Sequence, residues 1–186
     1  MRSIGLAATL LLSGALLFTC TSCGNEGDNP EGLLTATPDG NDYAFTYPDN
    51  WETLRDDSMV AIGSPDGLAN ISTACFSIPA DILSPREYAD GTDEHVGYLT
   101  MLGNTYGDAC TITSDEDTTL DGRDAVKITY HIRIGDDEYQ FVSVLAVLRT
   151  GFETSYLYDL TYTASPESFD THLPVFEQVC SSFSFN

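Results

Sequence analysis

The sequence has few basic residues. Only 7 lysines and arginines stand against 29 aspartates and glutamates in 186 residues, for a formal net charge of −22. A domain with this charge repels nucleic acid and anionic lipid headgroups, so neither is expected as a direct partner. The chain also lacks internal repeats, and its length suits one ordinary domain with a sizeable core.

No hydrophobic run is long enough to cross a bilayer as a stable helix. The longest, over residues 4–18, follows a single arginine and precedes a group of small residues, which is the pattern of a secretion signal. The residues after it, Thr-Ser-Cys at 21–23, resemble the lipobox of bacterial lipoproteins, although Cys20 stands where leucine is usual. An ordinary secretory signal with two incidental cysteines is the alternative.

The lipobox resemblance implies a signal peptide over residues 1–22 and lipid attachment at Cys23. Residues 23–32 would then form a flexible acidic tether, because they contain no apolar side chain to bury. Removal of Arg2 leaves 6 basic and 29 acidic residues, a net charge of −23. Such a domain would not adhere to a membrane by itself, so the lipid would hold it at the extracytoplasmic face of the cell membrane.

Cysteine is scarce and has no metal-site spacing: the chain has no CxxC and no Cys/His cluster, which argues against structural zinc. Cysteines 75, 110 and 180 remain in the domain, and thiols outside the cell tend to pair. Cys180 falls on the apolar stripe of a predicted helix, so we expect it to be buried and free. A Cys75–Cys110 bridge is favoured, and bridges from Cys180 to either residue remain open.

Turn signals predict strands and two helices over residues 33–186. The first helix has Ser84 as N-cap, Pro85 at its first position and Glu87 completing a capping box. Gly103-Asn104 is expected to end it. Ser165 and Pro166 open the second helix, whose apolar stripe is Phe169, Leu173, Phe176 and Cys180. The expected strand regions are the hairpins 33–48 and 59–78, then 110–114 with 118–120, 125–134, 139–149 and 154–163.

These elements predict an α+β fold: an α/β/α sandwich with an antiparallel sheet of about six or seven strands and two main helices. Register follows from the turns. If Ile134 faces Tyr139 and Arg149 pairs with Thr154, the tyrosines of 156–162 join the apolar face. The opposite, mixed face then carries a possible binding surface, made of Lys127, His131, Arg133 and Asp159.

This mixed face brings a histidine near a carboxylate, as acid–base catalysis requires. No serine or cysteine is placed beside His131 as a nucleophile, so structural pairing, or binding of an acidic partner, is the preferred interpretation. His95 and His172 are expected to be surface residues. Acidic residues 115–121 are dense enough to attract calcium, but the EF-hand pattern fails because Ile128 stands at its twelfth place. The weak metal candidates there are Asp115, Asp117 and Asp121.

Several segments, in order, resemble the PsbP-like family, which includes the extrinsic protein of photosystem II and DcrB-like bacterial lipoproteins. They are YPDNW at 47–51, NISTACFSI at 70–78, SPREY at 84–88, LDGRDAVKITY at 120–130 and the closing strand and helix. Pro48 would end its strand, and Trp51 would cover the open end of the core rather than stack on a ligand.

The resemblance implies a binding or assembly module without catalytic residues or a cofactor. We therefore expect a single domain over 33–186, lipid-anchored and extracytoplasmic, with a protein partner in the envelope. A metal- or small-ligand-binding lipoprotein, for calcium or manganese, is the alternative, and a hydrolase comes third.

Overall fold

The computed structural model of the chain describes residues 32–38, 42–56, 59–150 and 154–186. The expected signal peptide, Cys23 and all but the last residue of the expected tether lie outside these ranges. Within them, none of the helices is long and apolar enough to cross a membrane. The described elements are β1 Leu33–Ala36, β2 Tyr43–Pro48, β3 Glu52–Asp56, β4 Val60–Gly63, β5 Ala69–Ile78, α1 Pro85–Asp90, α2 Tyr98–Tyr106, η1 Gly107–Ala109, β6 Cys110–Leu120, β7 Arg123–Ile134, β8 Asp137–Thr150, β9 Thr154–Ala164, α3 Phe169–Ser182 and β10 Ser184–Phe185.

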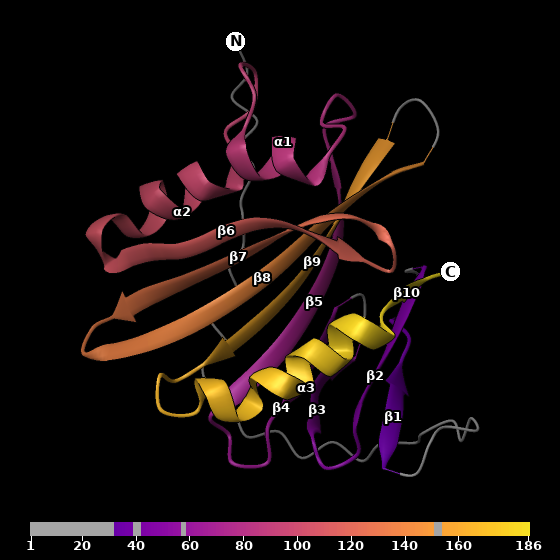
Figure 1. Cartoon of the computed structure of the whole chain (residues 1–186), viewed down its shortest axis with the longest axis vertical. Coiled ribbons are helices and arrows are strands. Elements are labelled where there is room, and N and C mark those ends of the chain that lie inside the picture. The colour runs from indigo at the N-terminus through magenta and orange to yellow at the C-terminus, as the bar shows by residue number, and fades with distance from the viewer. Residues whose placement is uncertain (1–31, 39–41, 57–58, 151–153) are drawn as a thin grey trace.

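A seven-stranded sheet in the order β3-β4-β5-β9-β8-β7-β6 forms the centre of the molecule (Figure 1). All its neighbouring strands are antiparallel. A smaller sheet, β1-β2-β10, brings the first and last described strands together. The structure confirms the predicted α+β fold and both predicted hairpins, whereas β3 and β10 had not been predicted.

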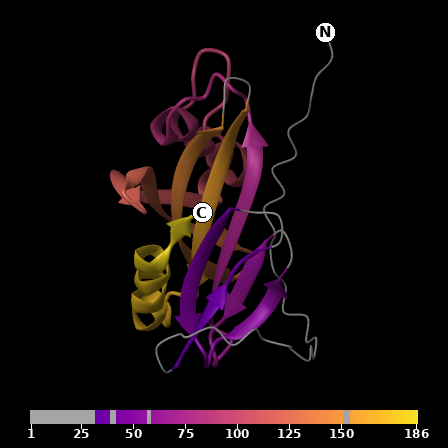
Figure 2. The ribbon, with the colours of Figure 1, turned by 90° about the vertical axis from the view of Figure 1, so that its right-hand side faces the viewer.

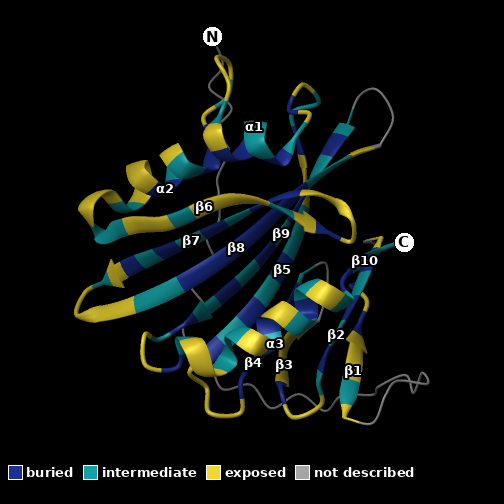
Figure 3. Cartoon of the chain, viewed as in Figure 1, coloured by how far each residue is buried: buried dark blue, intermediate teal, exposed yellow. Residues whose placement is uncertain are grey.

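The two faces of the large sheet carry separate hydrophobic cores. Beneath α3 and the small sheet lies a core that includes Phe45, Tyr162 and Phe176. A second core beneath α1 and α2 includes Leu102 and Ile128. Figure 2 shows α3 along one side of the twisted sheet, and Figure 3 shows that the middle of the sheet is buried while the outer sides of the helices are exposed. These are the layers of a sandwich built on an antiparallel sheet.

The predicted register between β8 and β9 is wrong by one residue. Arg149 lies opposite Ser155, and Thr150 lies opposite Thr154. A shift of one residue moves every side chain of a strand to the other face, so the tyrosines of β9 face α3 and Asp159 faces the α1/α2 side. Between β7 and β8 the predicted register is wrong by two, since Ile134 lies opposite Asp137. An even shift keeps each side chain on its predicted face.

Two of the predicted helix boundaries are also wrong. The capping box at Ser84 is present, but the first helix stops at Gly91, whose φ of +91° favours glycine. A second helix, α2, then runs through Gly103 and Asn104, which had been expected to end it. The last helix begins at Phe169 rather than at Pro166, because residues 166–168 form a turn.

Trp51 is buried, with 4% of its surface exposed. The chain turns directly before it through a hydrogen bond from the Trp51 amide to the carbonyl of Pro48, 3.0 Å long. Its indole meets the imidazole of His172 edge-on, with 5.7 Å between the ring centroids. The structure confirms that Trp51 belongs to the core, and it places His172, whose side chain is only 13% exposed, deeper than expected.

The three cysteines of the described domain are free thiols, so the favoured Cys75–Cys110 bridge is wrong. Cys75 lies on β5 and Cys110 on β6, with three strands between them. Four strand spacings amount to about 19 Å, far beyond the distance of about 7 Å that a disulfide can bridge. Cys180 is free and packs against the α3 core, but it is partly rather than fully buried. Burial raises the pKa of its thiol to about 12.

Candidate functional site

Three of the four residues expected to form a binding face share one face of β7. Lys127, His131 and Arg133 point to the α3 side, where Lys127 and His131 are half-buried and Arg133 is exposed. The Lys127 ammonium lies 3.7 Å from the carboxylate of Glu116, and His131 Nδ1 lies 3.0 Å from Glu138 Oε1. Lys127, His131 and Arg133 are called the basic strip below. The strip has an acidic neighbour on each side, Glu116 on β6 and Glu138 on β8.

The end of the basic strip opens into a small pocket of about 100 Å³. His131 and Arg133 supply its basic wall, and the pocket reaches the edge strand β6. The other lining residues are Asp108, Ala109, Thr111 and Glu138. A pocket of this size holds a side chain or a small ion rather than a drug-sized ligand.

Asp159 does not join the basic strip, because the one-residue change in register turns it to the opposite face of the sheet. It ends a chain of hydroxyl groups instead. Thr161 Oγ1 donates to Asp159 Oδ1 at 2.8 Å, and Ser143 Oγ lies 2.7 Å from Thr161 Oγ1. Two phenols complete the chain, since the hydroxyls of Tyr98 and Tyr130 lie 3.4 and 3.3 Å from Ser143 Oγ.

Burial controls the protonation of this hydroxyl chain. Desolvation raises the pKa of Asp159 to about 6, against the weaker effect of the Thr161 hydrogen bond. It also raises the pKa of Tyr130 to about 12. The phenols therefore remain neutral donors, and the group ties α2 to the sheet. Sequence reasoning missed this network, although a serine at 143 between two valines of an apolar strand was an available signal.

The acidic residues proposed as weak calcium ligands have other partners. Arg86 on α1 contacts Asp115 and Asp117, in both cases at 2.6 Å. Asp121 lies in the turn between β6 and β7 and accepts a hydrogen bond from the Phe185 amide. These carboxylates tie α1 and β10 to the β6–β7 hairpin, and the structure does not gather them around one point.

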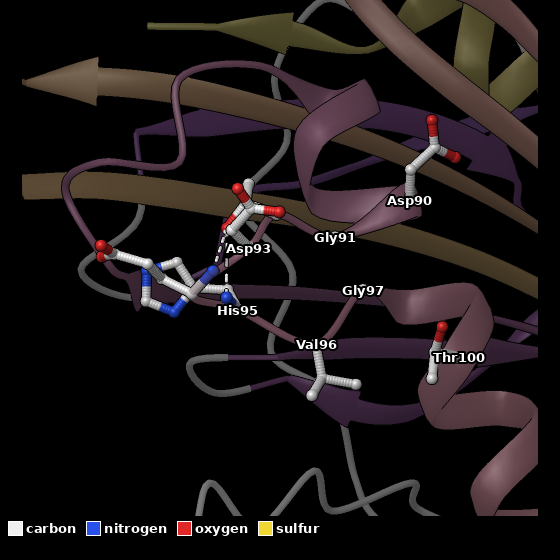
Figure 4. A pocket seen from close by; sticks show the side chains of 9 residues that line it. Asp90, Gly91, Asp93, His95, Val96, Gly97 and Thr100 are labelled. Carbon is white, nitrogen blue, oxygen red and sulfur yellow. Dashed lines mark hydrogen bonds between the residues drawn. The ribbon is translucent and has the colours of Figure 1, made fainter.

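A second group of side chains that could hold a metal ion lies beside the loop between α1 and α2. The imidazole Nε2 of His95 lies 2.9 Å from Asp81 Oδ2 and 3.0 Å from Asp81 Oδ1. Glu94 adds a carboxylate, and one donor atom from each of the three residues falls within 4.8 Å of the other two. Glu94 and His95 also line a shallow hollow of about 230 Å³ on the same loop (Figure 4).

The loop itself has a defined shape. Thr92 Oγ1 accepts hydrogen bonds from the amides of Glu94 and His95, and the Thr92 amide donates to the carbonyl of His95 at 2.9 Å. Gly91 and Gly97 close the loop, because a Cβ at Gly97 would lie 2.2 Å from the carbonyl carbon of Asp90. The loop therefore holds His95 in a position determined by its backbone.

Comparisons with known proteins give structural matches. Neither a scan against protein-family models nor a search of curated proteins finds a match. LpqN of Mycobacterium tuberculosis, involved in cell envelope biogenesis, matches at a TM-score of 0.62 with 12% identity, over 83% of this chain and 91% of LpqN. The cyanobacterial PsbP of Synechocystis matches at 0.58 with 17% identity, over 89% of this chain and 98% of that protein.

Both matches span nearly the whole of the compared proteins, so the likeness concerns the complete domain rather than one hairpin. At these identities it shows the fold and not the activity. The fold implied by the order of the segments that resemble the PsbP-like family is confirmed, and the chain has a PsbP-like fold.

Proposed function

We propose that this protein is a lipid-anchored extracytoplasmic module that binds a partner protein in the cell envelope and catalyses no reaction. The observation that carries the proposal is the combination of a lipobox-like Thr-Ser-Cys after a secretion signal with the fold of LpqN, a protein involved in cell envelope biogenesis. The expected anchor at Cys23 would hold the domain at the membrane through acyl chains. Without them, a domain with a charge of −23 would be repelled by anionic lipid headgroups.

The environment of the histidines supports a binding role. In the described part of the chain, the ring hydrogen-bond partners of His95, His131 and His172 are all carboxylates, at 2.8 to 3.0 Å. A histidine that activates a nucleophile needs a hydroxyl or thiol within the same distance. One group of buried hydroxyls lies around Ser143 and next to Asp159 instead, where it connects the sheet with α2.

The basic strip is the surface that we assign to the partner. Lys127 and Arg133 are two of the six basic residues of the mature chain, and they lie on one strand face beside a pocket. Elsewhere the domain is strongly acidic, so this strip is where a carboxylate of a partner would meet the least repulsion. Arg133, which is exposed, would contact the partner's carboxylate directly. The pocket beside His131 would receive the partner side chain that carries this carboxylate.

The test is copurification after cross-linking in cells that express the lipidated protein. Arg133→Glu reverses one charge of the basic strip, and Arg55→Glu makes the same change on β3, at the far edge of the sheet. We expect the cross-linked partner to disappear with Arg133→Glu and to remain with Arg55→Glu. Equal yields from both variants would contradict the assignment of the strip.

A further inference from the structure

We propose that Asp81, Glu94 and His95 form a binding site for a divalent transition-metal ion of the Zn²⁺ class. This site lies on the α1/α2 side of the sheet, away from the basic strip, and it does not depend on the anchoring or partner binding proposed above. The three residues come from two segments, the stretch after β5 and the loop between α1 and α2, which the fold brings together.

The donor set determines the class of metal. One imidazole nitrogen and two carboxylates suit zinc and its neighbours in the first transition row, whereas calcium prefers a shell made only of oxygen. Zinc bonds to nitrogen and carboxylate oxygen at about 2.0–2.2 Å. Three donor atoms within 4.8 Å of one another can reach those distances through rotation of exposed carboxylate side chains. Solvent would complete the coordination, as at open zinc sites.

The surroundings prepare this site for a cation. Backbone contacts hold the His95 segment, and in Figure 4 the ring points away from Thr100 and from α2. The imidazole is thus directed outward, with 29% of its side chain exposed, where an ion can reach it. A net charge of −22 attracts cations to the whole surface.

The other two histidines provide matched comparisons. His131 also lies 3.0 Å from a carboxylate, that of Glu138, and His172 lies 2.8 Å from Asp66. In the described residues, neither belongs to a group of three donors. A simple His–carboxylate pair is therefore present at all three positions, and the third donor, Glu94, distinguishes the proposed site.

The experiment measures binding of Zn²⁺ and Co²⁺ to the purified mature chain by calorimetry and absorption spectroscopy. We expect one saturable site, a Kd raised more than about tenfold by His95→Gln or Glu94→Gln, and no change with His131→Gln. Bound Co²⁺ should show ligand-field bands without thiolate charge transfer, which excludes the free cysteines as ligands. Folding of each variant is checked by its thermal transition.

Three results would overturn the proposal: no saturable binding, equal weakening by His131→Gln, or a thiolate band in the Co²⁺ spectrum. A site that binds Ca²⁺ as tightly as Zn²⁺ would also contradict it, because the imidazole would then contribute nothing. Loss of partner capture by Arg133→Glu leaves these outcomes unchanged, so this test and that of the basic strip can succeed or fail separately.

Discussion

Replacement of Asp159 by asparagine should stabilise the protein at neutral pH. The carboxyl is partly buried on the α1/α2 side of the sheet and accepts a hydrogen bond from Thr161 Oγ1. An asparagine has nearly the same shape, and its amide oxygen can accept the same bond. The substitution therefore removes the charge and keeps the packing unchanged. It measures how much the buried charge of Asp159 lowers the free energy of unfolding.

The sign and size of the effect follow from the pKa. Folding raises the pKa of Asp159 from 3.8 to about 6 through desolvation, so the folded chain retains a proton that the unfolded chain releases between about pH 4 and 6. Stability conferred by this group is greatest below pH 4 and is lost as the pH rises through 6. A shift of this size corresponds to about 3 kcal/mol, and residual solvent contact reduces it to about 1–3 kcal/mol.

Urea unfolding at intervals from pH 4 to pH 7 measures this contribution. The free energy of unfolding of Asp159→Asn should match that of the wild type at pH 4 and exceed it at pH 7. Asp124→Asn, which removes an exposed carboxylate from β7, corrects for the general repulsion among acidic residues. A difference between wild type and Asp159→Asn that does not vary with pH, or a destabilised variant at pH 7, would refute the reasoning.

Three further predictions concern the core, the thiols and the glycines. Trp51→Ala should lower the free energy of unfolding by about 3–5 kcal/mol, and an unchanged urea midpoint would mean that the indole is not packed. Alkylation of the unfolded domain of residues 33–186 without reductant should modify three thiols per chain, and fewer would indicate a disulfide. Gly97→Ala should lower the melting temperature, whereas Gly103→Ala, whose Cβ meets no atom within 4 Å, should stabilise α2 by about 0.5–1 kcal/mol.

Features set by neighbouring residues were predictable from the sequence. The capping box of Ser84 and Glu87 depends on local turn chemistry, as do the β1–β2 and β4–β5 hairpins, and the structure contains all three. The burial of Trp51 followed from the proline that ends β2. Such features need no knowledge of where distant segments lie.

Features that depend on loop geometry or on distant contacts were not predictable. A difference of one residue in the pairing of Arg149 moved Asp159 to the other face and separated it from the basic strip. The approach of Asp81 to His95, and that of Tyr98 to Ser143, depends on the break in the helix at Gly91. Gly91 weakens a helix without requiring it to end, so the sequence alone does not place the break.

Membrane fractionation of cells expressing the wild type, Cys23→Ser and Cys20→Ser tests the central claim, that this domain is held at the membrane by a lipid on Cys23. Mass spectrometry of the N-terminal peptide accompanies it. The wild type and Cys20→Ser should sediment with membranes and carry an acylated N-terminus at Cys23. Cys23→Ser should be soluble or retain its signal peptide. Loss of acylation with Cys20→Ser alone, or membrane association and normal processing of Cys23→Ser, would contradict the account.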